Sequence, residues 1–322
     1  MPANSYDAVV IGGGHNGLVA AAYLAKQGAQ TVVLEKRHKT GGAADTMEPW
    51  PDELPGVKVN TLSYTMSLMP PTIRRELQLE KFGFKMLPLG QGYMPMRGGG
   101  SIIQHTDDKI TRDSIERISK KDADAYFEFY EWVGHIADIM GPLLMKTPPH
   151  LGSRKFGDLK DVFQLAWGLR KQVDEQTAAD ITRLFTMSAT DLLERWFETP
   201  QMKGFMAING IIGTWAGPDA PGTAYVLMHH SVGDIGDGEV ASWGFMEGGM
   251  GAVADAVRAS AESKGAEIRV NAPVERVLIR DGRTYGVALG SGEELHAPLV
   301  ITSCHPKITF LRQIERSELP DG

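Results

Sequence analysis

A run of glycines directly after an apolar segment is the feature that most constrains how this chain can fold. Residues 7–11 are rich in β-branched side chains, residues 12–17 read Gly-Gly-Gly-His-Asn-Gly, and small apolar residues follow at 18–25. A second β-branched segment comes at 31–34. Strand, glycine turn, helix and strand within about 30 residues predict a βαβ unit. Parallel pairing of its strands places the glycine turn at the carboxyl edge of a sheet, where α/β folds bind their ligands.

The spacing of the glycines indicates what that edge binds. Gly12, Gly14 and Gly17 satisfy G-x-G-x-x-G, in which the first glycine permits a tight turn, the second lets backbone N–H groups approach a pyrophosphate, and the third allows close packing of helix on strand. Glu35 directly follows the second strand, where an acid accepts hydrogen bonds from ribose hydroxyls and disfavours a 2′-phosphate. Together these residues predict a dinucleotide site. The alternative is a plain glycine turn with a surface Glu35.

Beyond the βαβ unit the pattern changes twice. Residues 50–105 are rich in proline and predict loops with a few short strands, whereas residues 122–205 carry apolar side chains at helical spacing. Capping patterns place helix starts at Thr177, Ser188 and Thr199. The α/β rhythm returns after the glycines at 248–251, with a helix at 252–264, a strand at 267–270, a hairpin of 274–280 and 285–289, and a strand at 299–302.

This order of elements predicts the α/β fold class. We expect a discontinuous, Rossmann-like domain of residues 1–80 and 240–322, built from a parallel sheet plus a β-hairpin. A mainly helical cap or substrate region, with some strands, interrupts it at 81–239. Within that region, residues 204–233 carry one charged side chain, Asp219, so they form either buried core or the apolar wall of a substrate pocket.

Composition excludes several classes of function. The chain has 33 Lys and Arg against 40 Asp and Glu and no basic block, so a nucleic-acid partner is not expected. One cysteine, Cys304, excludes an intramolecular disulfide and a dithiol redox pair. The adjacent His229 and His230 point in different directions and lack ligands at a suitable spacing, so no metal site is predicted.

The expected location is the cytoplasm. The N-terminus is short and polar, without the features of a signal peptide, and no window of 18 continuous apolar residues occurs. Peripheral attachment to a membrane surface is an alternative that no cationic amphipathic helix in the sequence supports. A mitochondrial location is the alternative for a eukaryotic source.

A second pair of glycines narrows the type of dinucleotide. Gly41-Gly42 follows Glu35 by six residues, and the run from Leu34 to Thr46 resembles the extended motif of the flavoprotein superfamily that contains amine oxidases and phytoene desaturases. Ala43 stands where many amine oxidases carry an arginine. The whole set of motifs resembles the phytoene-desaturase-like branch and, within it, the pyridine nucleotide-disulfide oxidoreductase domain-containing proteins. The resemblance rests on residues 14–24, 41–44, 195–198, 221–230, 248–252 and 308–311.

The resemblance implies FAD as the cofactor. Val274 matches a strand whose backbone meets the adenine, and Ser303 falls where the chain passes near the dinucleotide; packing of a hairpin and a loop start are their alternatives. The candidate cofactor-binding residues are Gly12, Gly13, Gly14, His15, Asn16, Gly17, Glu35, Lys36, Gly41, Gly42, Ala43, Val274 and Ser303.

The implied function is FAD-dependent hydride transfer from a C–H bond of a small apolar substrate, of the desaturase, dehydrogenase or isomerase type, with an unidentified electron acceptor. A flavin-binding interaction or regulatory protein without turnover is the alternative, and an NAD-dependent dehydrogenase is a third. The sequence singles out no catalytic residue and no oligomeric state. Members of this branch carry a glycine-rich C-terminal segment that returns to the flavin. No such segment follows Pro306, so the chain is expected to be C-terminally truncated.

Overall fold

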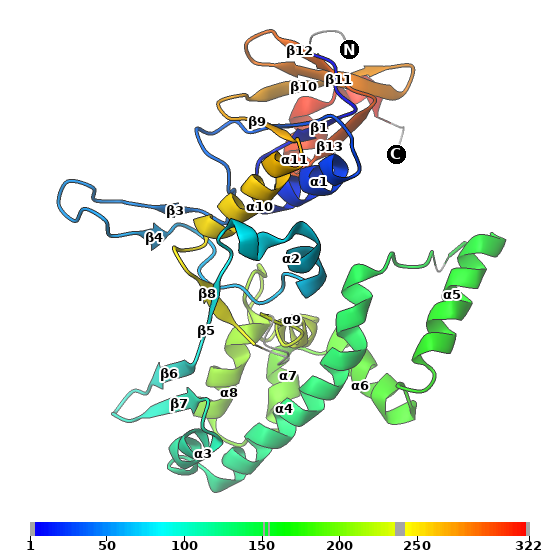
Figure 1. Ribbon diagram of the computed structural model, residues 1–322. Coiled ribbons are helices and arrows are strands. Elements are labelled where there is room, and N and C mark those ends of the chain that lie inside the picture. The colour runs from blue at the N-terminus through cyan, green and yellow to red at the C-terminus, as the bar shows by residue number, and fades with distance from the viewer. Residues whose placement is uncertain (1–3, 151, 154, 236–241, 320–322) are drawn as a thin grey trace. The chain divides into compact units, whose positions relative to one another are not determined.

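The computed structural model describes residues 4–150, 152–153, 155–235 and 242–319 (Figure 1). The chain divides into two compact units, Met1–Leu87 with Gly244–Gly322, and Pro88–Trp243. The boundary expected from the sequence at residues 239–240 lies outside the described residues. Each unit has its own core and is described separately.

A four-stranded parallel sheet forms the centre of the first unit. Its order is β13-β1-β2-β9, with bounds β1 (Ala8–Ile11), β2 (Thr31–Leu34), β9 (Glu267–Arg269) and β13 (Leu299–Thr302). Every residue of β1 and β2 is buried, as expected for inner strands of a parallel sheet that is covered on both faces. The predicted α/β class with a parallel sheet is confirmed.

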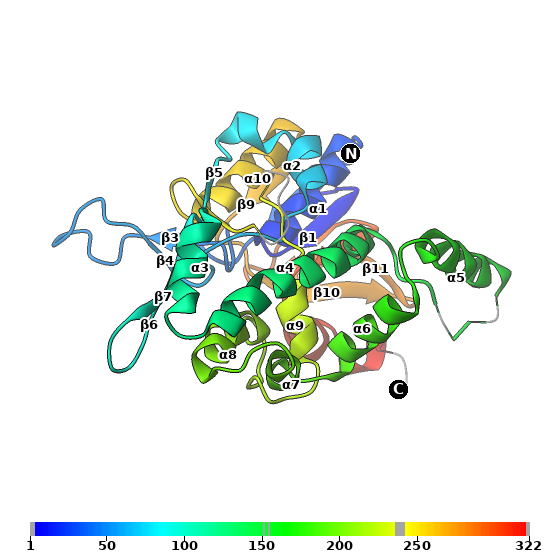
Figure 2. The same ribbon diagram turned by 90° about the horizontal axis from the view of Figure 1, so that it is seen from below.

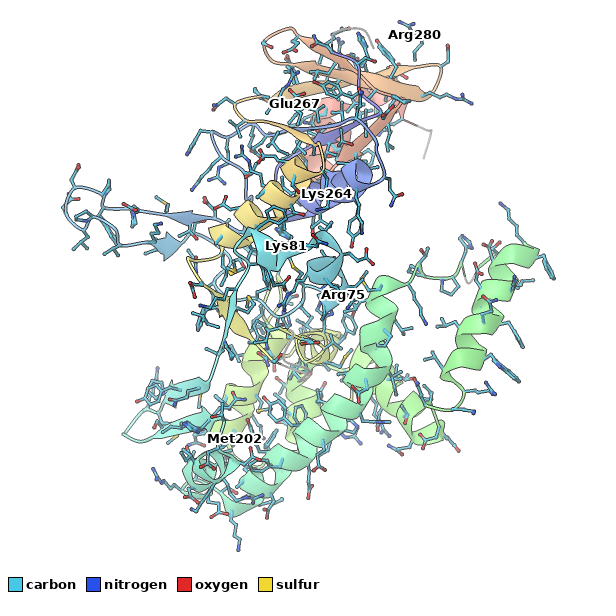
Figure 3. All side chains as sticks on the ribbon, in the orientation of Figure 1. Arg75, Lys81, Met202, Lys264, Glu267 and Arg280 are labelled. Carbon is cyan, nitrogen blue, oxygen red and sulfur yellow. The ribbon has the colours of Figure 1, made fainter. Side chains whose placement is uncertain are left out.

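Two helices cover one face of this sheet (Figure 1). Helices α1 (His15–Lys26) and α10 (Gly251–Ser263) pack together through small residues such as Ala21, Ala22 and Ala254. The side chain of Lys264, labelled in Figure 3, donates to Ser260 Oγ at 2.7 Å, and Ser260 Oγ donates to the carbonyl of Leu77. These contacts hold α10 against α2 (Pro71–Leu77).

A three-stranded antiparallel sheet covers the other face. Strands β10 (Val274–Arg280), β11 (Arg283–Leu289) and β12 (Glu294–His296) pack Val287 and Leu295 against Val9 and Val32. Asp281 and Gly282 form the predicted turn, both with positive φ, as a type I′ hairpin requires. The first unit therefore has three layers.

Short elements complete the first unit. Helix α2 lies in a region where the sequence predicted only loops and short strands. Pro71 occupies its first turn, where the missing N–H costs nothing, and Leu77 is buried. The others are β3 (Thr46–Met47), β4 (Val59–Asn60), η1 (Leu79–Phe82), β5 (Met86–Pro88), β8 (Gly244–Met246), α11 (Pro306–Ile308), the π-helical turn η4 (Thr309–Gln313) and η5 (Arg316–Glu318).

The second unit is mainly helical. It contains the hairpin β6 (Gln91–Pro95) and β7 (Ser101–His105), and the helices α3 (Asp108–Glu116), α4 (Lys120–Met140), η2 (Gly141–Met145), α5 (Phe156–Leu169), α6 (Glu175–Thr186), α7 (Ala189–Glu194), α8 (Pro200–Ala207), η3 (Ile208–Gly210) and α9 (Thr223–His229). Figure 2 shows α4 lying across α9. Its core gathers Phe129, Ile136, Leu193, Met202 and Leu227.

Side-chain caps begin several helices of this unit, among them α3, α4, α6, α7 and α8. Ser188 and Thr199 cap α7 and α8 as predicted, accepting from the N–H groups of Asp191 and Met202. The predicted start at Thr177 is wrong. Asp174 caps α6 instead, because its carboxylate accepts from the Thr177 N–H at 2.8 Å.

Candidate cofactor site

The first glycine loop is shaped by contacts with distant parts of its own unit. Gly12 has φ +99°, and a Cβ added to it would lie 2.7 Å from Ser303 Oγ. A Cβ on Gly17 would lie 2.1 Å from the carbonyl oxygen of Gly12. At Gly14, by contrast, the only described heavy atom within 4 Å would be the Gly42 Cα, at 3.9 Å. The fold itself requires glycine at 12 and 17, whereas Gly14 leaves open space for a ligand to approach the backbone.

The second glycine pair lies directly against the first loop. Gly41 donates its N–H to the carbonyl of Gly13 at 2.8 Å, and Gly14 and Gly41 form an isolated parallel bridge. Gly41 and Gly42 have φ values of +130° and +62°. Ala43, which follows them, is exposed. Two segments separated by more than twenty residues in the sequence thus form one surface of backbone.

The carboxylate of Glu35 binds the first glycine loop and the backbone of Arg37. The Glu35 side chain is 7% exposed; Oε2 accepts from the Gly13 N–H at 2.8 Å and Oε1 accepts from the Arg37 N–H at 2.9 Å. A carboxylate oxygen has two lone pairs, so each oxygen keeps the capacity to accept from a ribose hydroxyl. Lys36, beside it, is exposed.

The N-terminus of α1 has unsatisfied polar groups. Gly14, at the N-cap, has no side chain to cap the first-turn N–H groups. His15 Nδ1 is buried without a hydrogen-bond partner among the described residues, and burial lowers the pKa of His15, so its ring is neutral at pH 7. Asn16 is exposed. Backbone donors and helix dipole suit an anionic phosphate, and the orphan nitrogen suits a polar group of the same ligand.

Of the two candidate residues from the C-terminal part of the sequence, Ser303 contacts the first glycine loop. Ser303 Oγ lies within hydrogen-bond distance of the carbonyls of Gly12 (3.0 Å) and Ile11 (3.2 Å). Val274 pairs with Leu289 in the hairpin, and its carbonyl accepts from Gln313 Nε2. The structure therefore places Ser303 on the glycine loop, whereas Val274 lies in the hairpin in contact with Leu289 and Gln313.

Sequence reasoning missed an ion cluster beside the second glycine pair. Asp45, 4% exposed, binds the guanidinium of Arg37 at 2.6 Å and the ammonium of Lys39. Burial alone raises the pKa of Asp45, but hydrogen bonds and charge from Lys39 and Arg37 hold it below its ordinary value. The sequence signal that indicates this cluster is the presence of two basic residues, Arg37 and Lys39, and one acidic residue, Asp45, on either side of Gly41-Gly42.

The third glycine run is held by two polar side chains. Thr46 Oγ1 accepts from the Gly251 N–H at 2.8 Å, and Asn60 Oδ1 accepts from the Met250 N–H at 2.9 Å. A Cβ on Gly249 would lie 2.5 Å from Thr46 Oγ1. A pocket of about 590 Å³ lies here, lined by charged groups of both signs, among them Lys39, Lys58, Asp255 and Arg258.

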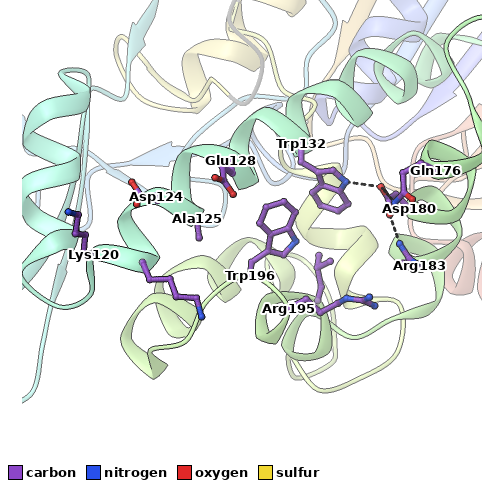
Figure 4. Close-up of a pocket in the computed structure, with 12 residues that line it drawn as sticks. Lys120, Asp124, Ala125, Glu128, Trp132, Gln176, Asp180, Arg183, Arg195 and Trp196 are labelled. Atoms are coloured by element: carbon purple, nitrogen blue, oxygen red, sulfur yellow. Dashed lines mark hydrogen bonds and ion pairs between the residues drawn. The ribbon is translucent and has the colours of Figure 1, made fainter.

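The second unit contains a larger pocket of about 1000 Å³ (Figure 4). Trp132 and Trp196 lie side by side in it, with ring centroids 5.5 Å apart. Trp132 Nε1 donates to Asp180, which also binds Arg183. The side chains that line this pocket carry charges of both signs, so the lining alone indicates no class of ligand.

Among the described residues, no group of three or more His, Cys, Asp or Glu side chains could hold a metal ion. No helix in this part of the chain has the length and apolar character needed to cross a membrane.

The two adjacent histidines contact aromatic side chains. His229 stacks on Tyr225, and His230 stacks on Trp243. In the predicted core or wall segment 204–233, Met206 and Leu227 are core residues, while Trp215 is fully exposed.

Comparison with known proteins agrees with this geometry. Residues 114–309 match the flavin containing amine oxidoreductase family, and residues 10–77 match the NAD(P)-binding Rossmann-like domain. Pyridine nucleotide-disulfide oxidoreductase domain-containing protein 2 of Rattus norvegicus is 35% identical over 329 residues, covering 98% of this chain and 56% of the relative. Hydroxyneurosporene desaturase of Rubrivivax gelatinosus is 26% identical over 311 residues, covering 93% and 53%.

A solved structure shares the fold. Cyclohexylamine oxidase from Brevibacterium oxydans IH-35A aligns with a TM-score of 0.57 at 19% identity, covering 98% of this chain and 61% of that one. The chain spans about half the length of the curated relatives it matches. The resemblance seen in the sequence motifs is confirmed. Because the family match covers more than half of its residues, the chain belongs to the flavin containing amine oxidoreductase family.

Proposed function

We propose that this protein binds FAD and acts as an oxidoreductase. It would take a hydride from a C–H bond of an apolar substrate, as a desaturase, dehydrogenase or isomerase does. The observation that carries the proposal is the contact of two glycine loops with each other and with Glu35. Gly41 donates to the Gly13 carbonyl, and the Glu35 carboxylate accepts from the Gly13 N–H. Such a backbone surface at the N-terminus of a helix suits a dinucleotide pyrophosphate.

Named residues would hold the cofactor. The first-turn N–H groups of α1 and the open backbone at Gly14 would bind the pyrophosphate, Glu35 would accept from the ribose, and His15 would offer its buried ring nitrogen. Ser303 keeps the glycine loop in shape through Gly12. Bound flavin supplies hydride-accepting chemistry at its N5, so the protein's task is to bind, orient and exclude water.

The proposed substrate class is supported by the relatives. One relative is named as a hydroxyneurosporene desaturase. We propose an apolar substrate and a separate electron acceptor as the partners.

Titration of the purified chain with FAD and with NADH tests the cofactor. The expected result is retention of FAD with its visible absorbance band and no retention of NADH; tight binding of NADH in place of FAD would contradict the proposal. Anaerobic mixing of the FAD-loaded protein with apolar polyenes or terpenes then tests turnover. Bleaching of the flavin band is expected, whereas binding without bleaching by any candidate would favour a flavin-binding protein without turnover.

A further inference from the structure

Helix α5 of the second unit leaves its apolar side chains in solvent. None of its 14 residues is buried, whereas every other helix of eight or more residues in the described part of the chain buries at least two. Phe156, Leu159, Phe163 and Trp167 are 85%, 52%, 64% and 56% exposed. Figures 1 and 2 both show α5 at the margin of the helices of this unit. Large apolar side chains gathered on one exposed element mark a surface that binds something else.

These side chains lie on one face of the helix. Successive residues of an α-helix are rotated by about 100°, so Phe163 and Trp167 lie about 20° on either side of Phe156, which is at the centre of the face. Leu159 lies about 60° from that centre. The rings of Phe163 and Trp167 are stacked, with centroids 5.8 Å apart. The apolar face of α5 is therefore convex, and it suits a surface into which side chains can insert.

The charges of α5 are arranged around this apolar face. Lys160 and Arg170 lie on either side of it, each about 40° from its centre, whereas Asp158 and Asp161 lie about 140–160° away from the centre. Lys160 and Arg170 are exposed, and neither forms an ion pair with another described residue. The Arg170 guanidinium lies over the Trp167 ring, 3.6 Å from its centroid. The chain as a whole has a net charge of −7, so this helix is a local surface that complements negative charge.

We propose that α5 binds the surface of a membrane that contains anionic lipids, with the helix lying in the plane of the surface and its apolar face inserted among the headgroups. Basic amphipathic helices with aromatic side chains on the apolar face bind lipid in this way. Lys160 and Arg170 would reach the lipid phosphates, while Asp158 and Asp161 would face the water. A second copy of this chain is a poorer occupant, because two α5 helices packed face to face would bring their cations together.

Helix α5 corrects one prediction made from the sequence. The prediction that the chain has no cationic amphipathic helix is wrong, because α5 is one. Gly157 and Gly168 lie within it, and since glycine is a poor helix former they obscure the pattern in the sequence. The membrane proposal rests on α5 alone and does not depend on the proposed function.

Co-sedimentation of the full chain with lipid vesicles tests the proposal. Vesicles of phosphatidylcholine are compared with vesicles in which about one lipid in three is the anionic phosphatidylglycerol. We expect at least about fivefold stronger binding to the anionic vesicles, and weaker binding as salt is added, because salt screens exposed charges. Trp167→Gln should weaken binding at least about tenfold, since its ring is a large part of the inserted surface. Tyr93→Gln removes an aromatic side chain that is 68% exposed on β6, and this matched control should bind like the wild type.

The role of charge is tested separately with Lys160→Gln. This variant should lower the preference for anionic vesicles at least about twofold, because one of the two cations beside the apolar face is lost. Lys307→Gln makes the same change in net charge at an exposed position of the first unit and should keep the wild-type preference.

Three results would overturn the membrane proposal: no binding to anionic vesicles, equal binding to both kinds of vesicle, or wild-type binding by Trp167→Gln. Analytical ultracentrifugation without lipid tests the rival occupant. A wild-type dimer that becomes monomeric in Trp167→Gln would mean that a second copy covers α5, and it would also overturn the proposal. Phe163→Gln gives the same test if Trp167→Gln does not fold. None of these results bears on FAD binding, so the proposed function is decided by its own titration.

Discussion

The carboxylate of Glu35 accepts a hydrogen bond from the backbone N–H of Gly13 at 2.8 Å. The residue expected to bind the ribose therefore also holds the phosphate-binding loop in place. Its other oxygen accepts from the Arg37 N–H, so one side chain connects the end of β2 with the loop after β1. Loop shape and ribose recognition are thus coupled through a single carboxylate.

Replacing Glu35 with Gln is expected to weaken both functions. The amide nitrogen cannot accept, so one backbone N–H, at Gly13 or Arg37, loses its partner. We expect a loss of about 1–3 kcal/mol in the free energy of unfolding, measured by urea denaturation, together with at least about tenfold weaker FAD binding. Lys36→Gln, which alters the exposed neighbour, should change stability by less than about 0.5 kcal/mol. Wild-type stability and affinity in Glu35→Gln would refute the coupling.

The glycines of the first loop should separate into two kinds. Gly17→Ala places a methyl group 2.1 Å from the Gly12 carbonyl, so we expect a large loss of thermal stability. Gly14→Ala meets only the Gly42 Cα at 3.9 Å, and its φ of −71° suits alanine, so the protein should fold normally. The methyl group would nevertheless block the approach of a pyrophosphate, and FAD affinity should fall at least about tenfold.

A melting curve and an FAD titration of both variants check this. Gly134→Ala, inside α4 with open space around it, serves as a control for the substitution itself. Normal FAD binding by a folded Gly14→Ala protein would count against a pyrophosphate at this position.

Asp45 should contribute to the acid sensitivity of the protein. Although burial by itself raises its pKa, Lys39 and Arg37 lower it below the ordinary value of 3.8 in the folded state. The stabilisation is therefore complete above that ordinary value and is lost as the pH falls through the lowered pKa. Asp45→Asn should cost about 1–3 kcal/mol at pH 7 and less at an acid pH below the ordinary value of 3.8. Urea denaturation at both pH values measures the difference; an equal cost at the two would show that the charge is not what matters.

Asp122 should stabilise the second unit. It is fully buried and accepts from the N–H groups of Glu198 and Thr199 and from the hydroxyl of Thr199. Asp122→Ala leaves these donors without a partner and should cost about 3 kcal/mol or more. Asp124→Ala, which removes an exposed pair with Arg112, should cost less than about 1 kcal/mol. Similar melting temperatures for the two variants would show that the buried contacts do not carry this stability.

Local patterns allowed much of the fold to be predicted. The β-branched runs at 8–11 and 31–34 are buried strands, and the caps at Ser188 and Thr199 begin helices, because these signals involve neighbours within a few residues. The start of α6 was misplaced because Thr177 and Asp174 both carry capping oxygens, and the choice between them depends on which turn packs.

The sequence by itself determined the strand, glycine turn and helix, since backbone geometry at Gly12 and side-chain periodicity act over short distances. Only the tertiary structure decided that Ser303 contacts Gly12, that Gly41 binds Gly13, and that Gln313 buries an unpaired amide beside Val274. These contacts join residues that are far apart in the chain, and their geometry depends on how the sheets and helices stack. The spacing of residues along the sequence carries no record of that stacking.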